Sequence, residues 1–192
     1  MDNLFSSNMY VLKRQVLALT GVFRLYDAND TLTLYCKQKM FSLREDIRLY
    51  NNEQMQEELL HIQARNLIDF SAAYDVFDSR LGTKIGTLRR KGVNSIIRDQ
   101  WEVLDASEQT IGTLIEDSTA LALARRMLLG ALLPQNYDLL VNETRYVDIR
   151  QRFNLFRYEL EIDFRENIGD KIDRRLGIAA GILLAAIEGR QN

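Results

Sequence analysis

Residues 176–187 read LGIAAGILLAAI and contain no charged or hydrogen-bonding side chain. Asp173, Arg174 and Arg175 precede this apolar run, and Gly189 follows it closely. Because Ala and Leu favour helices and Asp is a good N-cap, we predict an α-helix that begins near Asp173 and ends at a glycine cap. A helix that is apolar on every side must be buried in protein or in lipid.

The apolar run is too short for a membrane span. A dozen residues at roughly 1.5 Å each make a helix of about 18 Å, whereas a span needs about 20 residues. We therefore expect the helix to be buried by the rest of the protein. Gly177, Gly181 and Ala185 recur at every fourth position and leave a smooth stripe along which another backbone can come close.

Length and charge limit the possible classes of protein. The chain has 192 residues, of which 46% are hydrophobic, so we expect residues 1–192 to form a single domain with a sizeable core. The net charge of -2 and the sequence pI of about 5.6 provide no global attraction to nucleic acid or to an anionic membrane. We expect no nucleic-acid partner, and contact with anionic lipid would need a local basic patch.

The N-terminus lacks a signal peptide, and the single cysteine fits a reducing cytosol, although it fits other compartments nearly as well. The sequence MDNLFSSNMYVLKRQ lacks the basic start and apolar run of a signal peptide. Cys36 has no second cysteine to pair with, and alternation places it with Leu32 and Leu34 on one face of a strand. We expect a buried structural thiol and a cytoplasmic protein, with peripheral membrane association as an open possibility and no cofactor.

Most of the chain has the alternating pattern of β-strands. Short alternating segments recur from Tyr10 onward and are separated by polar turns such as Ala28-Asn29-Asp30. Their spacing suits hairpins. The predicted strands after the first cover residues 22–27, 31–38, 46–50, 56–64, 73–78, 84–88, 100–105, 110–114, 137–141, 144–153 and 157–164.

Two hairpins look like copies of one unit. AYDVFD at residues 73–78 is followed by a turn and KIGTL, and QWEVLD at residues 100–105 is followed by a turn and TIGTL. Asp at the end of the first strand can accept N–H groups of the turn, and glycine within a strand marks a bulge or a close backbone approach. We interpret the unit as a structural device.

After Glu116 the pattern becomes helical. Asp117 and Ser118 can cap the run TALALARRMLLGALL, which Pro134 ends. About a dozen strands suit a closed barrel, whose interior must be filled, and the apolar helix is the obvious filler. We predict a mainly β (α+β) fold in which an about twelve-stranded closed β-barrel encloses the C-terminal helix, with one additional outer helix.

This arrangement resembles the tubby C-terminal-like fold, and the sequence is most similar to its LURP-one-related branch. The resemblance extends from about residue 10 to residue 191. It is carried by YVLKR (10–14), FRLYD (23–27), KQK (37–39), YDVFD (74–78) with IGT (85–87), and DRRLGIAA (173–180).

The resemblance implies more about fold than about activity. Tubby proteins, which share the fold, bind phosphoinositide headgroups through a basic patch on the barrel, and phospholipid scramblases are also related. The Pro-rich N-terminal segment and the acylated cysteine cluster of scramblases are absent from this sequence. Fold kinship alone does not establish a function.

The sequence contains no recognisable catalytic or metal-binding signature. His61 is the only histidine, and no nucleophile elbow, HExxH, P-loop or GxGxxG motif is present. The Asp residues fit no calcium-loop spacing. We therefore expect a protein that is not an enzyme. Enzymatic activity ranks third, after the two binding hypotheses that follow.

Binding of anionic headgroups is the first functional hypothesis. Several strand pairings could bring local basic clusters together, where phosphate groups would receive charge-assisted hydrogen bonds. The alternative is that these residues only solvate an exterior face. The candidate ligands are Lys13, Arg14, Lys37, Lys39, Arg89, Arg90, Lys91 and Arg98.

The second hypothesis is a protein interaction module. Apolar residues at 127–133 exceed what one packed helix face requires, so this segment could bind a partner or mediate self-association. The oligomeric state is open at this stage.

Overall fold

The computed structural model describes residues 3–15, 20–39, 46–65, 73–91, 100–116, 135–152 and 157–188. They form a short 3-10 helix η1 (Asn3–Phe5), a twelve-stranded barrel and the C-terminal helix α2 (Arg174–Glu188). The strands are β1 (Met9–Gln15), β2 (Thr20–Asp27), β3 (Leu32–Lys39), β4 (Asp46–Tyr50), β5 (Glu58–Ala64), β6 (Ala73–Asp78), β7 (Thr83–Arg90), β8 (Gln100–Asp105), β9 (Thr110–Glu116), β10 (Asn136–Val141), β11 (Thr144–Arg152) and β12 (Arg157–Asp163).

The barrel is antiparallel and closed. Each strand pairs with its neighbours in sequence, and β12 pairs with β1 from Met9 opposite Asp163 to Gln15 opposite Arg157. Closure leaves no unpaired sheet edge. The predicted mainly β, closed barrel is confirmed, with strand bounds within a few residues of those expected. The outer helix predicted before Pro134 lies outside the described residues.

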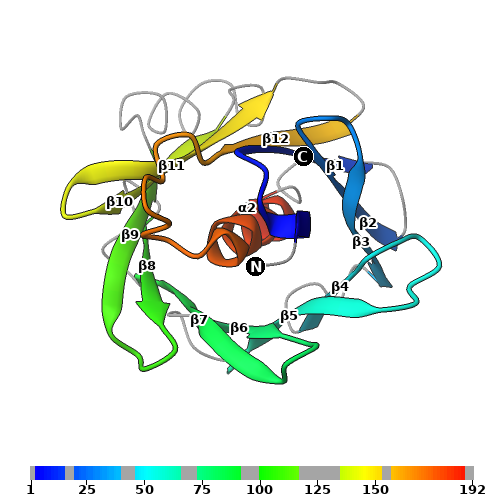
Figure 1. The fold of residues 1–192 in the computed structure, drawn as a ribbon, viewed down its shortest axis with the longest axis horizontal. Helices are drawn as coiled ribbons and strands as arrows, with labels where there is room; N and C mark the ends of the chain where they lie inside the picture. Colours follow the sequence, from blue (N-terminus) through cyan, green and yellow to red (C-terminus); the bar gives the residue numbers. More distant parts are fainter. Residues whose placement is uncertain are drawn as a thin grey trace.

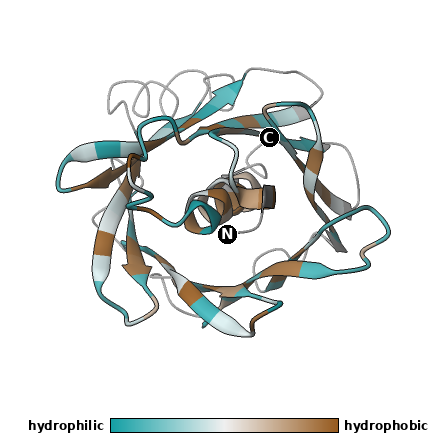
Figure 2. Ribbon diagram, in the orientation of Figure 1, coloured by the Kyte–Doolittle hydropathy of each residue, from teal (hydrophilic) through white to brown (hydrophobic). Residues whose placement is uncertain are grey.

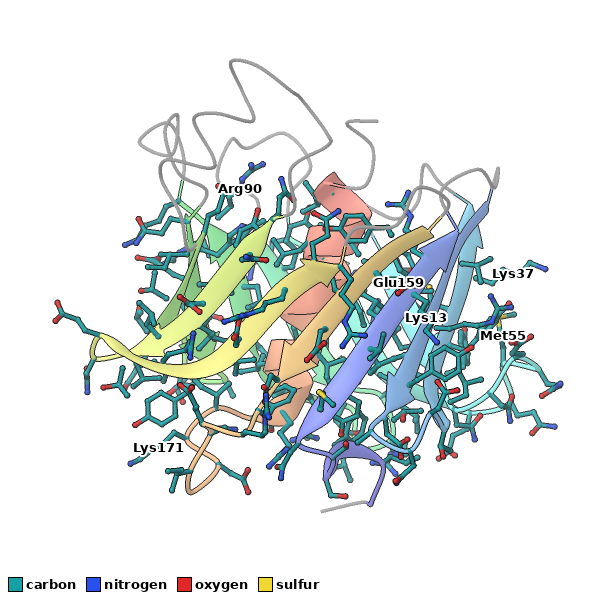
Figure 3. All side chains as sticks on the ribbon, turned by 90° about the horizontal axis from the view of Figure 1, so that it is seen from above. Lys13, Lys37, Met55, Arg90, Glu159 and Lys171 are labelled. Atoms are coloured by element: carbon teal, nitrogen blue, oxygen red, sulfur yellow. The ribbon has the colours of Figure 1, made fainter. Side chains whose placement is uncertain are left out.

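All the described turns lie at one end of the barrel, which we call the hairpin end (Figure 3). It comprises residues 3–8, 28–31, 51–57, 79–82, 106–109, 142–143 and 164–173. The strands run from there to the opposite end, where β1 ends and β12 begins.

Aspartates fix the turns as the sequence predicted. Asp27 Oδ1 accepts the N–H groups of Asn29 and Thr31, each at 2.9 Å. Asp105 Oδ1 does the same for Ser107 and Gln109, at 2.8 and 2.9 Å. These carboxylates satisfy turn N–H groups that the strand ladder leaves unpaired.

Glycine in the repeated hairpins allows close strand packing. A Cβ atom on Gly86 would lie 2.3 Å from the carbonyl oxygen of Leu104, and one on Gly112 would lie 2.8 Å from that of Leu140. The strand ladder also shifts register opposite each glycine. The shift lies between Val76 and Phe77 in the β6–β7 hairpin and between Val103 and Leu104 in the β8–β9 hairpin. The predicted close backbone approach is confirmed at both positions.

Helix α2 lies within the outline of the strands when the barrel is viewed along its axis (Figure 1). Its apolar side chains at residues 176–186 are each at most 1% exposed. A Cβ on Gly177 would lie 2.6 Å from the Phe164 ring, and one on Gly181 would lie 2.5 Å from Ile162 Cδ1. The small residues therefore let the helix backbone approach β12 and the residue that follows it. Figure 2 shows the hydrophobic helix and the alternation of hydropathy along the strands.

Arginine contacts hold both ends of the helix. At the N-terminus, Asp173 Oδ1 accepts the N–H of Arg175 at 2.9 Å, and the Arg175 guanidinium donates to Asp78 Oδ2 at 2.7 Å. At the C-terminus, Arg14 Nη1 donates to the carbonyl oxygen of Ala185 at 2.5 Å. A cation there also complements the negative end of the helix dipole. No helix in the described ranges is long and apolar enough to cross a bilayer.

Substitution of Ala180 by Asp tests the burial of α2. Ala180 is 1% exposed, and an unpaired carboxylate there would cost several kcal/mol, comparable to the total stability of a domain, which is about 5 to 15 kcal/mol. We expect Ala180→Asp to unfold the protein or to lower its melting temperature strongly, as measured by circular dichroism. Gln54→Asp, in an exposed turn, is the control. A variant at Ala180 that melts like the control would contradict the burial.

Candidate functional site

The predicted basic residues divide between two sides of the barrel. Lys13 and Arg14 lie on β1, Lys37 and Lys39 on β3, and Arg89 and Arg90 on β7 with Lys91 directly after it. Strand β7 is four strands from β3 and six from β1 around the barrel. Figure 3 shows Lys13 and Lys37 far from Arg90. The structure therefore does not bring these clusters into one site. Arg98 lies outside the described residues.

Arg14 points into the barrel and does not face solvent. It is 2% exposed, and its guanidinium binds the helix carbonyl of Ala185 and lies 5.6 Å from the Phe23 ring centre. This placement follows the alternation of β1, since Tyr10 and Leu12 are also buried. Its sequence neighbour Lys13 is also basic, which made Arg14 look like a surface ligand, but alternation along the strand turns the two side chains to opposite faces.

The remaining residues on this side are a dispersed group. Lys13 Nζ lies 4.4 Å from the centre of the Tyr26 ring and 3.5 Å from Asp30 Oδ1. Lys37 is exposed and forms no ion pair with another described residue. Lys39 pairs with Thr20 through the strand ladder. These positions supply positive charge but no enclosed site.

The β7 cluster gathers around a single carboxylate on β8. Arg89 donates to Glu102 Oε2 from Nη2 at 2.6 Å and from Nε at 2.9 Å, and Lys91 Nζ lies 3.4 Å from Glu102 Oε1. The hydrogen bond from Arg89 lowers the pKa of Glu102, and the charge of Lys91 adds to this effect. The Arg90 guanidinium lies 5.8 Å from the Trp101 ring centre. Arg89, Lys91 and Glu102 together keep an excess positive charge.

Charge is distributed unevenly along the barrel axis. The opposite end comprises, in each strand, the three residues nearest to it, together with Arg65 after β5 and Lys91 after β7. These positions contain twelve basic and six acidic residues. The segments of the hairpin end contain three basic and eight acidic residues. The opposite-end residues are Lys13, Arg14, Lys37, Lys39, Arg48, Arg65, Arg89, Arg90, Lys91, Arg150, Arg152 and Arg157, against Asp46, Asp75, Glu102, Glu116, Asp138 and Glu159.

One outer groove combines both signs of charge. It has a volume of about 410 Å³ and lies along β11, β12 and the residues after β12. Arg150 Nε lies 2.8 Å from Asp148 Oδ2, and Arg145 Nη2 lies 2.7 Å from Glu166 Oε1. The groove is thus largely neutralised by its own ion pairs. Its lining is Arg145, Asp148, Arg150, Glu161, Asp163, Arg165 and Glu166.

A second pocket, at the hairpin end, was not predicted from the sequence. It has a volume of about 530 Å³ and lies beside the start of α2. Leu81 in its wall is 72% exposed. A leucine at the tip of the turn SRLG was the only sequence signal for it. The lining is Phe5, Asp78, Arg80, Leu81, Asp173, Arg174 and Arg175.

A polar network joins β5, β6, β7 and the β8–β9 turn. Arg65 donates to Asp75 at 2.7 and 2.8 Å, Thr87 Oγ1 donates to Asp75 at 2.7 Å, and Lys84 Nζ lies 2.9 Å from the same carboxylate. Arg65 and Lys84 also bind Glu108. Burial raises the pKa of Asp75, but these hydrogen bonds outweigh burial and lower it to about 2.

The only histidine and the only cysteine of the chain lie in surroundings that fit a structural role. His61 Nε2 lies 2.5 Å from Asp46 Oδ1, and no hydrogen bond joins His61 to a Ser, Thr or Cys among the described residues. Cys36 is fully buried, as predicted, and burial raises the pKa of its thiol to about 12. A search of the described ranges found no group of three or more possible metal ligands from His, Cys, Asp and Glu.

A comparison with models of known protein families identifies the family of this chain. The family model described as LURP-one-related matches residues 32–184, from β3 into α2. The chain belongs to the LURP-one-related family. The resemblance noted in the sequence is thereby confirmed. No curated protein and no solved structure gave a significant match to this LURP-one-related chain.

The Asp75 network of this LURP-one-related barrel predicts a loss of stability in acid. The folded-state pKa of Asp75 is about 2, below its ordinary value of 3.8. The stabilisation is therefore present above the ordinary value and is lost as the pH falls toward about 2. Asp75→Asn should cost up to about 2 kcal/mol at neutral pH and flatten the decline in unfolding free energy between about pH 5 and pH 2. Urea unfolding at several pH values measures this.

The matched control is Asp30→Asn. The Asp30 side chain is 82% exposed and has one ion pair, at 3.5 Å. Exposed pairs of this kind contribute about 0 to 1 kcal/mol, so the control should keep the acid-dependent slope. Equal slopes for the Asp75 variant and the wild type would show that the network does not stabilise the fold.

Proposed function

We propose that this LURP-one-related chain is a non-catalytic barrel module that binds anionic phospholipid headgroups, of the phosphoinositide type, at a membrane surface. In this proposal the strands enclose α2 as an internal support, and the opposite end of the barrel faces the lipid. The observation that carries it is the charge at that end. With the buried Arg14 and Glu116 left out, and without Lys13 and Arg65, which pair with carboxylates of the hairpin end, nine basic residues stand against five acidic ones.

Headgroup phosphates match this chemistry. Arginine offers several N–H donors in a planar fork and binds phosphate oxygens through paired, charge-assisted hydrogen bonds. Each Lys or Arg near an anionic membrane surface contributes about 1 kcal/mol to binding, and added salt weakens that attraction. The positive charge in this protein is local, since the whole chain has a net charge of -2.

The β7 cluster is the best anchor within the described residues. Arg89 and Lys91 have side chains that are 41% and 43% exposed, and they share the Glu102 carboxylate. A phosphate would compete with Glu102 for these two cations. Lys37 and the other basic residues across the barrel would add attraction without direct coordination.

A binding role is also favoured over a catalytic one. Family membership and the closed barrel support a non-catalytic module. His61 is engaged by Asp46 and has no nucleophilic side chain bound to it among the described residues. Covalent catalysis of the Ser–His or Cys–His type needs such a partner within hydrogen-bond reach.

Vesicle flotation with phosphoinositide-containing and neutral vesicles tests the proposal. Replacement of Arg89, Arg90 and Lys91 by Ala should weaken binding at least about tenfold, because three cations are lost. The control removes the three basic residues of the hairpin-end segments, Arg80, Arg165 and Lys171, for the same change in net charge. Binding by the control should stay close to wild type, and added salt should weaken both.

Glu102→Gln should strengthen vesicle binding, whereas the alanine variant should weaken it. It removes the carboxylate that competes with phosphate, so binding should tighten by about twofold to fivefold, the range expected for an exposed ion pair. Tighter binding by this variant cannot be explained by loss of folding. Equal flotation of the wild type, the alanine variant and the control would refute headgroup binding at β7.

A further inference from the structure

Exposed apolar side chains collect at the hairpin end. Four large hydrophobic residues are exposed in the described part of the chain: Leu4, Met55, Leu81 and Ile168, at 37%, 42%, 72% and 80%. All four lie in hairpin-end segments. Scattered exposed residues of this kind are ordinary on protein surfaces, and of these four Leu81 lines the hairpin-end pocket.

The hairpin-end pocket supplies a place for an apolar anchor. Its volume of about 530 Å³ is within the range of about 300 to 1,000 Å³ that is usual for binding pockets, and barrel mouths are common locations for them. Phe5 and Leu81 provide apolar surface in its lining. A leucine or similar side chain of a partner could be buried against them.

The walls of this pocket are held in place before any partner arrives. Asp78 Oδ1 accepts the N–H groups of Arg80 and Leu81 at 3.0 and 3.1 Å, and its other oxygen accepts from Arg175. Arg174 donates to the carbonyl oxygen of Ser7 at 2.5 Å. A preformed pocket lowers the entropic cost of binding.

The charge around the pocket selects the partner. The pocket lining itself contains Arg80, Arg174 and Arg175 beside Asp78 and Asp173, whereas the hairpin-end segments around it contain eight acidic and three basic residues. The side chains of Asp30, Glu166 and Asp170 are 82%, 56% and 49% exposed, and a basic partner would share them with Lys13, Arg145 and Arg174, with which they form ion pairs. This acidic surface repels anionic headgroups and attracts Lys and Arg.

We propose that the hairpin end is a docking surface for a basic segment of a partner protein. An apolar side chain of that segment enters the pocket beside Leu81, a second packs on Ile168, and flanking Lys or Arg residues face the turn carboxylates. This surface is separate from the basic end that binds lipid in the proposed function. The module would thus bind lipid at one end and a basic protein at the other.

Fluorescence anisotropy with the full chain tests the proposal. The probe is a labelled synthetic peptide in which Leu is spaced among Lys and Ser residues. One control peptide has Ser in place of Leu, and another has Glu in place of Lys. We expect the Lys/Leu peptide to bind at least about tenfold more tightly than either control, since each lacks one of the two interactions.

Variants locate the site. Leu81→Ser with Ile168→Ser should weaken binding about tenfold or more without a change in melting temperature, because both side chains are already exposed. Asp30→Asn, Glu143→Gln and Asp170→Asn together should weaken binding and reduce its salt dependence. The Arg89/Arg90/Lys91 alanine variant should bind as the wild type does, so failure of lipid binding leaves this result intact.

Three outcomes would overturn the proposal. The first is no binding of the Lys/Leu peptide, or binding that the Leu81/Ile168 variant retains. The second is equal binding of the Glu peptide. The third is that Leu81 and Ile168 are needed for flotation with anionic vesicles or for self-association of the chain in sedimentation, while peptide binding does not depend on them.

Discussion

The burial of one apolar helix is the constraint on which the rest of the structure depends. Residues 176–186 have no side chain that can face water, and each buried Leu or Ile contributes roughly 1.5 to 3 kcal/mol. The strands that surround α2 in Figure 1 form a closed ring, and apolar side chains on every strand are buried. Gly177 and Gly181 set how closely β12 can approach. Arg175 and Arg14 then secure the two ends of the helix, so polar contacts fix the position that hydrophobic burial favours.

The two ends of the barrel and its outer face are the surfaces on which the two proposals rest. Among the described residues, the ends differ in charge. Turn aspartates such as Asp27 and Asp105 serve the hairpins themselves, whereas Glu143 and Leu81 have no comparable role in the turns. In the two proposals, which use this separation, a lipid surface binds at one end of the barrel and a basic protein segment at the other.

Local patterns were sufficient to predict most of the fold. Alternation identified the hairpins, and Gly86 and Gly112 marked close approaches because only backbone geometry explains glycine within a strand. The site was less predictable, since it depends on contacts between distant segments. Arg14 faces inward because Tyr10 and Leu12 do, and Glu102 neutralises part of the β7 cluster because β7 and β8 pair in that register. The hairpin-end pocket joins residues from η1, the β6–β7 turn and α2, and no short sequence motif contains all three.

Amide hydrogen exchange measured along the whole chain tests the central claim most directly. A helix whose apolar side chains are all buried exchanges its amides only when the packing around it opens, so exchange should report global unfolding. The account predicts that residues 178–186 exchange among the slowest in the protein, at rates that match the strands packed against them, β1, β7 and β12. Exchange of these helix amides at the rate of the exposed β4–β5 turn would show that α2 leaves the barrel independently, and would contradict the account.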